Sequence, residues 1–160
     1  MSVIVSDRKE SRFEAVTFSL ELHDMLIGLM QRGFCVKDLS CLVRERYRLG
    51  RNANEDYDFY RFLMQEHKIH LNQLCYQLTN DVRGANSIYP TTMDEYRKRR
   101  DFQTSAIVVC EQMIKELQRI IDVYDVDLNL YKPYTNAIDR EIGLIKKWRR
   151  RDNKIKSYVG

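Results

Sequence analysis

The chain has 160 residues, of which 44% are hydrophobic and 31% are charged, and its net charge is +4. No apolar run reaches the length of a membrane span, no signal peptide opens the chain, and the four cysteines form no C-x-x-C pair. We therefore expect one soluble domain over residues 1–160 in the reducing cytoplasm. Six glycines and two prolines are few for this length, which favours long helices.

The first half of the chain predicts three helices. The first ten residues carry no clear period and are expected to fray. A helix is then expected from about Ser11 to Gln31, ended by Arg32-Gly33, and a shorter one from about Val36 to Leu49. A third helix over roughly 55–83 has apolar residues three and four positions apart, and Gly84 is its expected C-cap.

The second half predicts a helical hairpin. One helix starts after Thr91 or Thr92, either of which can act as an N-cap, and ends around Asp125. The other starts at Pro133 and runs to about Asp152. Their expected core residues are Ala106, Cys110, Met113, Leu117, Ile120 and Tyr124, and then Ile138, Ile142, Ile145 and Trp148. The prediction is an all-α fold, an up-and-down four-helix bundle with an extra short helix between helices one and two.

Two dense basic runs lie in this hairpin. One is Arg97-Lys98-Arg99-Arg100, and the other is Lys146-Lys147-Trp148-Arg149-Arg150-Arg151, which continues to Lys154 and Lys156. Because a short loop makes the two helices antiparallel neighbours, both runs should reach the same end of the bundle. The helical rise predicts an offset of roughly 10 Å between them.

Such a surface favours an anionic partner, most plausibly the backbone of a nucleic acid. The alternative is a solvated charged face, in which the second run stabilises the last turn of its own helix. Trp148 falls on the apolar stripe and is expected in the core. The candidate nucleic-acid-binding residues are Arg97, Lys98, Arg99, Arg100, Lys146, Lys147, Arg149, Arg150, Arg151 and Lys154.

Signals for catalysis are weak. His67, His70 and Cys75 could begin a metal site, but no second pair of ligands follows at a fixed offset, so we expect no metal and no cofactor. Arg61 and His67 resemble the Arg-x(4–6)-His motif of HEPN ribonucleases, although Phe62 replaces the polar residue that usually follows the arginine. On a regular helix these side chains point about 120° apart. We therefore predict that the chain is not an enzyme, with a HEPN-like ribonuclease as a less favoured alternative.

Residues 86–154 carry a family resemblance. The segments ANSIYPTTMDEYRKRRDFQTSAIVVCEQMIKELQRIID and YTNAIDREIGLIKKWRRRDNK resemble helices three and four of the accessory variability determinant family of diversity-generating retroelements. That family is related to the four-helix proteins encoded by intervening sequences in 23S ribosomal RNA genes. The resemblance covers a little under half of the chain and lies in helix order and in the pattern of basic, aromatic and core positions.

This resemblance implies a specific role. Members of the accessory variability determinant family form a pentameric barrel of helical bundles, and they bind the reverse transcriptase of the retroelement and its RNA. It implies a non-catalytic RNA-binding accessory protein that assists a retroelement reverse transcriptase as a homo-oligomer, a pentamer by analogy, with no small-molecule substrate. The anion contacts it implies are Arg97, Arg99, Arg100, Lys146, Lys147, Arg149 and Arg150. The alternative is a helical protein-interaction or oligomerisation module without nucleic acid.

Overall fold

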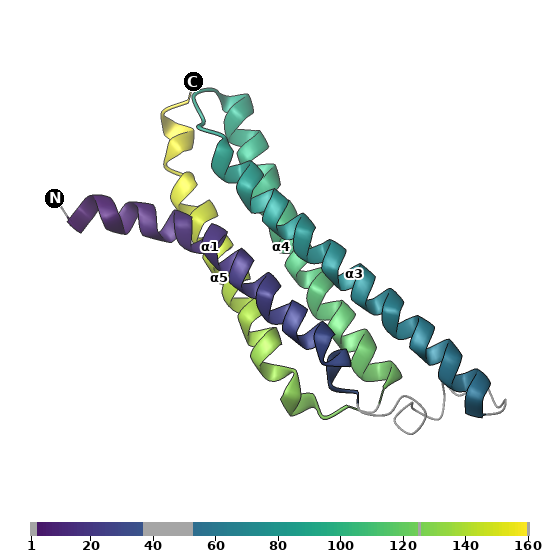
Figure 1. Ribbon diagram of the computed structural model, residues 1–160. Coiled ribbons are helices and arrows are strands. Elements are labelled where there is room, and N and C mark those ends of the chain that lie inside the picture. The colour runs from purple at the N-terminus through teal and green to yellow at the C-terminus, as the bar shows by residue number, and fades with distance from the viewer. Residues whose placement is uncertain (1–2, 37–52, 125, 160) are drawn as a thin grey trace.

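The computed structural model describes residues 3–36, 53–124 and 126–159, with side chains from Glu14 and from Tyr57 onward in the first two ranges. Within these ranges the chain forms long helices joined by short 3-10 turns, which confirms the predicted all-helical fold (Figure 1). The long helices are α1 (Val3–Gln31), α3 (Ala53–Ser87), α4 (Met93–Val123) and α5 (Lys132–Asp152). The turns are η1 (Gly33–Cys35), η3 (Leu128–Leu130) and η4 (Ile155–Ser157). None of the described helices combines the length and apolar character that a membrane span requires.

The four long helices pack as an up-and-down bundle, as predicted. Helix α3 packs against α1 and α4, and α5 packs against the same two helices from the other side (Figure 1). Each helix contributes an inner stripe to one continuous core, which contains Leu22, Leu71, Met113 and Ile138 among its fully buried residues. Burial of these stripes stabilises the bundle, since each helix needs its neighbours to cover the apolar side chains that it turns inward.

Two helix boundaries differ from the sequence prediction, namely the start of α1 and the end of α3. Helix α1 begins at Val3, well before the expected start at about Ser11; no glycine or proline between Val3 and Arg12 interrupts the helix. Helix α3 continues through Gly84 to Ser87, so Gly84 is not a C-cap. The short helix expected over 36–49 lies almost entirely outside the described residues.

The start of α4 is fixed by a capping box. The backbone N–H of Glu95 donates to Oγ1 of Thr92 at 3.2 Å, and the N–H of Thr92 donates to Oε2 of Glu95 at 3.1 Å. A hydrogen bond from the Thr91 hydroxyl, with backbone donors from Thr91 and Thr92, holds the pKa of Glu95 below its usual value. The N-cap predicted at Thr91 or Thr92 is therefore Thr92, only a few residues before the first basic run.

Candidate nucleic-acid interface

The beginning of α4 and the end of α5 lie side by side, as the predicted hairpin requires. Arg100 donates from its NH1 group to Oδ1 of Asn153 at 2.9 Å, and Arg149 donates from NH1 to Oγ1 of Thr104 at 3.3 Å. These bonds place the run 97–100 opposite residues 153–156, so the two basic runs share one end of the bundle. Lys146 lies about two helical turns further along α5, which agrees with the offset of roughly 10 Å.

The four basic residues of the first run do not share a face. Consecutive residues of an α-helix point about 100° apart, so four in a row must diverge. Arg97 and Arg100 line a cavity against the end of α5, whereas Lys98 lines a separate cavity against α3. Arg99 points into the bundle and is 3% exposed. The four residues of this basic run therefore lie in three different environments: two cavities and the core.

Arg99 is bound entirely inside the protein. Its Nε and NH2 groups donate to Oδ2 and Oδ1 of Asp152 at 2.6 and 2.9 Å, and its NH1 group donates to the carbonyl of Ile88 at 3.0 Å. Gln103 donates to the same Asp152 carboxylate at 2.8 Å, and the guanidinium carbon lies 5.2 Å from the centre of the Trp148 ring. Trp148 is 3% exposed, as expected of a core residue. The prediction of Arg99 as an anion contact is therefore corrected, because a buried bidentate pair leaves no donor facing solvent.

A cavity of about 320 Å³ lies where η4 meets the first turns of α4. Besides the Arg100 contact with Asn153, the NH1 group of Arg100 lies 3.3 Å from the Tyr96 hydroxyl, so two partners hold this guanidinium in place. Lys156, outside the predicted set, adds another positive charge. The cavity is lined by Met93, Tyr96, Arg97, Arg100, Asn153 and Lys156.

The cations continue along the groove between α4 and α5. Arg149 reaches across it to Thr104, and exposed Lys146 precedes Arg149 by one helical turn. Among the described side chains, Asp94 is the carboxylate that pairs with one of them, at 3.8 Å from Arg97; both side chains are at least 70% exposed, so this pair neutralises little charge. We call the set of cations along this groove the basic seam; it comprises Arg97, Arg100, Lys146, Arg149 and Lys156.

The remaining predicted residues of the second run lie beside the basic seam. They are all exposed: three lie on the last turns of α5, away from the core residues Ile145 and Trp148, and the fourth follows the end of that helix. They raise the positive potential around the seam without lining its cavity. These residues are Lys147, Arg150, Arg151 and Lys154.

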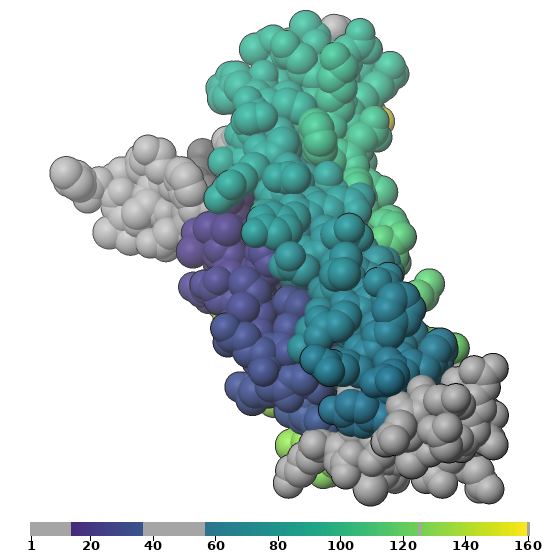
Figure 2. All heavy atoms as spheres, turned by 45° about the vertical axis from the view of Figure 1, so that its right-hand side comes forward, coloured from purple at the N-terminus to yellow at the C-terminus, as the bar shows by residue number. Residues whose placement is uncertain are grey.

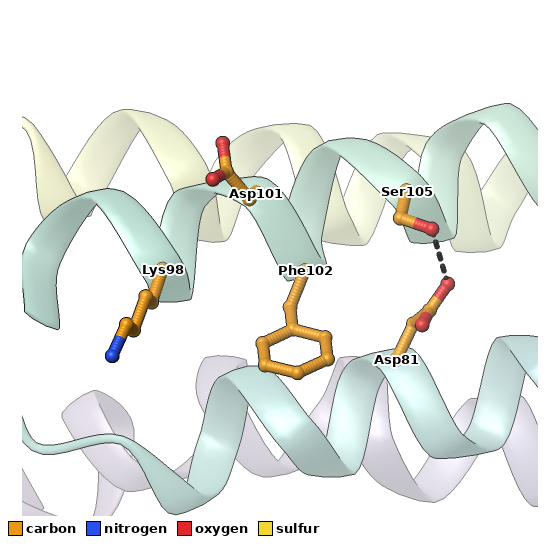
Figure 3. A pocket seen from close by; sticks show the side chains of 5 residues that line it. All are labelled: Asp81, Lys98, Asp101, Phe102 and Ser105. Atoms are coloured by element: carbon orange, nitrogen blue, oxygen red, sulfur yellow. Dashed lines mark hydrogen bonds between the residues drawn. The ribbon is translucent and has the colours of Figure 1, made fainter.

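Lys98 has a different environment. It lines a cavity of about 310 Å³ between α3 and α4 together with Asp81, Asp101, Phe102 and Ser105. In Figure 3 the Phe102 ring projects from α4 toward α3, and Ser105 reaches Asp81, to whose Oδ2 it donates at 2.6 Å. Burial raises the pKa of Asp81, and the Ser105 hydrogen bond opposes that effect. The two carboxylates near Lys98 make this cavity a poor place for a polyanion.

The histidines of α3 are joined to α4 by one carboxylate. Nδ1 of His67 and Nδ1 of His70 lie 2.6 and 2.8 Å from Oε1 and Oε2 of Glu116. Burial alone would raise the pKa of Glu116, but these two hydrogen bonds outweigh it and hold that pKa below its usual value. No group of ligands suited to a metal ion occurs in the part of the chain that the structure describes. Arg61 is exposed whereas His67 is buried, so they lie on different faces of α3.

The basic seam is thus a row of cations, of which Arg100 and Arg149 are held by hydrogen bonds to neighbouring side chains. Its chemistry is electrostatic: guanidinium groups present several N–H donors in a plane and match phosphate oxygens. No protein family model, curated protein or solved structure matches this chain.

Proposed function

We propose that this protein binds the phosphate backbone of a nucleic acid along the basic seam. The single observation that carries the proposal is the row of five cations at one end of the bundle, two on α4, two on the antiparallel α5 and Lys156 on η4. Arg100, held by Tyr96 and Asn153, lies near its middle. Successive cations on a helix face recur about every 5.4 Å, so the row suits a repeating polyanion better than one small anion.

The buried ion pair of Arg99 and Asp152 also supports this proposal, because it holds the helix ends that carry the basic seam. Asp152 ends α5 and Arg99 lies near the start of α4, so their bidentate bond fixes the two helix ends that carry the seam. A preorganised groove binds a polyanion with a smaller loss of side-chain freedom than separate flexible cations would.

The family resemblance extends the proposal to a partner. It rests on the same hairpin and suggests a non-catalytic RNA-binding protein that assists a retroelement reverse transcriptase as a homo-oligomer. A reducing cytoplasmic location fits this proposal, because Cys75 and Cys110 are buried free thiols. Burial raises the pKa of Cys75 to about 12, which keeps that thiol protonated and unreactive.

Charge reversal tests the basic seam. We expect Arg100→Glu with Arg149→Glu to weaken binding of a structured RNA by roughly 100-fold or more, because attraction is replaced by repulsion at two phosphate contacts. The matched control is Lys115→Glu with Lys132→Glu, two exposed positions at the opposite end of the same hairpin. Affinity is measured by fluorescence anisotropy, and circular dichroism checks that both variants stay helical.

The control variant changes the net charge by the same amount as the seam variant. A difference in RNA affinity between them therefore reports the position of the substituted charges and not the total charge. We expect it to keep its RNA affinity within about threefold of the wild type. Equal weakening by the two variants, or no weakening by the seam variant, would show that RNA binding does not depend on this groove.

A second candidate function is a helical interaction or oligomerisation module without nucleic acid. The observation that favours it is a set of exposed aromatic and aliphatic side chains on α3, among them Phe62, Ile69 and Tyr76. This candidate predicts a stable homo-oligomer that carries no nucleic acid after purification. Light scattering together with the ratio of absorbance at 260 and 280 nm separates the two candidates.

A further inference from the structure

The outer face of α3 carries a regular apolar stripe. Phe62, Ile69 and Tyr76 are 59%, 52% and 58% exposed, and successive members are seven residues apart. Figure 2 shows α3 in teal running along this side of the molecule, with α1 in purple and blue beside its lower half. A spacing of seven is that of one of the two contact positions in each heptad of two packed helices.

This stripe lies directly opposite the core side of α3. Each of its members precedes a buried core residue by two positions, which is a rotation of about 200° around the helix. Those core residues are Met64, Leu71 and Leu78, at most 5% exposed. Helix α3 is therefore apolar on two opposite sides, and the bundle covers only one of them. A helix with two apolar faces is typical of one that packs against a second partner.

The stripe is also self-complementary. Phe62 and Tyr76 lie at equal distances on either side of Ile69. If a second copy of α3 packs antiparallel with the two Ile69 side chains in contact, Phe62 of each copy meets Tyr76 of the other. We propose that this protein forms a homodimer through α3, with a two-fold axis that passes between the two Ile69 residues.

The polar residues beside the stripe fit the same arrangement. Arg83 continues the seven-residue series at one end of the stripe, and in this register exposed Asp58 of the second copy lies within one helical turn of it; the two-fold axis repeats this pair of opposite charges. On one side of the stripe, exposed Glu66 lies next to Gln73 of the second copy, whose amide can donate to the carboxylate. A parallel arrangement in the same register would instead place each of these charged residues opposite its own copy.

The exposed area is sufficient for a specific dimer. About half of each stripe side chain is exposed, which is on the order of 100 Å² per residue for groups of this size. Two copies therefore supply roughly 600 Å² of apolar area. Since interfaces are roughly 60% apolar, the total area is about 1,000 Å², near the lower limit of specific interfaces.

The proposed dimer leaves the basic seam free. Helix α3 packs on α1 and α4, whereas the seam lies between α4 and α5. A two-fold α3 interface closes after two copies, whereas the five-fold ring suggested by the family resemblance needs a different, heterologous contact. Mass therefore distinguishes these assemblies.

The first test is a charge on the two-fold axis. Ile69→Glu places two carboxylates opposite each other, and we expect the dimer dissociation constant to rise by about 100-fold or more. Val108→Glu, at a 45% exposed position of α4, is the matched control and should leave the mass unchanged. Both are measured by sedimentation velocity over a concentration series up to about 100 μM, a range that detects dimers of moderate affinity.

The second test is an exchange of the opposite charges Asp58 and Arg83 at the ends of the stripe. Asp58→Arg alone should weaken the dimer, because it brings like charges together, and addition of Arg83→Asp should restore it. A monomeric wild type, or an Ile69→Glu variant with the wild-type mass, would overturn the α3 interface. Failure of the double variant to recover would overturn the antiparallel arrangement.

Discussion

Glu141 is fully buried on α5, and neither of its carboxylate oxygens has a hydrogen-bond partner among the described residues. Burial raises its pKa from 4.5 to about 9; nearby Arg140 opposes this effect and Glu14 adds to it. The Cys110 thiol is close enough for its own pKa to be raised by Glu141, after the larger effect of burial. Glu141 is therefore protonated in the folded protein at neutral pH and is ionised in the unfolded chain.

This difference predicts a pH-dependent stability. The pKa is raised by folding, so the stability is complete below pH 4.5 and falls as pH rises toward about 9, because only the unfolded state releases the proton. Glu141→Gln removes the titration, so we expect the variant to be more stable than the wild type by roughly 3 kcal/mol at about pH 7 and equal to it near pH 4. Urea unfolding at several pH values measures the difference, with Glu111→Gln, at an exposed position, as the control. If the free energies of unfolding of the wild type and of Glu141→Gln changed with pH in the same way, this explanation would be contradicted.

The burial of Arg99 and Asp152 was not predicted, although the sequence contains the pattern that indicates it. The core stripe predicted on α4 starts at Ala106, and one heptad before it is Arg99. Likewise, Asp152 lies one heptad after Ile145 on α5. Continuing both stripes would have placed these two charges inside the bundle, where they could only pair with each other. Lys156 could not be found in this way, because its place in the cavity depends on η4, a turn that has no apolar period.

At the level of single elements, the strongest sequence signals were helix caps and breakers. Thr92 caps α4 as predicted, and Pro133 lies in the first turn of α5, which begins one residue earlier at Lys132. Gly84 was predicted to end α3 and does not. A Cβ atom on Gly84 would lie 2.9 Å from Cε1 of Phe102, so glycine here serves the contact between α3 and α4. That use depends on a residue from another helix, which no local pattern shows.

The Gly84 contact can be tested by a double-mutant cycle. Alanine normally stabilises a helix interior by about 1 kcal/mol relative to glycine. We expect Gly84→Ala to give no gain in the wild type, because the Phe102 ring must move away, but to give up to about 1 kcal/mol in a Phe102→Leu background. Free energies of unfolding from urea titrations measure both changes. An equal gain in the two backgrounds would mean that the ring and Gly84 do not compete for space.

At the scale of the whole molecule, the bundle and its hairpin were predictable from amphipathic periods and short loops. Those two features also predicted that the basic runs meet, and the contacts of Arg100 and Arg149 confirm it. The composition of the seam was less predictable, since each residue of a run points in its own direction. In the structure Arg97 and Arg100 line the cavity together with Lys156, and Arg149 bonds to Thr104 across the two helices. Lys146 is exposed one helical turn from Arg149, whereas Lys98 lines another cavity and Arg99 is buried.

If the basic seam binds nucleic acid through phosphate contacts, RNA affinity must depend steeply on salt concentration. Four to five contacts predict a slope of about −3 for log affinity against log salt concentration with a single strand, hence a loss of roughly 60-fold between about 50 and 200 mM salt. The slope should fall by about half in the Arg100→Glu and Arg149→Glu variant. RNA affinity that is independent of salt, or a slope that the variant leaves unchanged, would contradict the account.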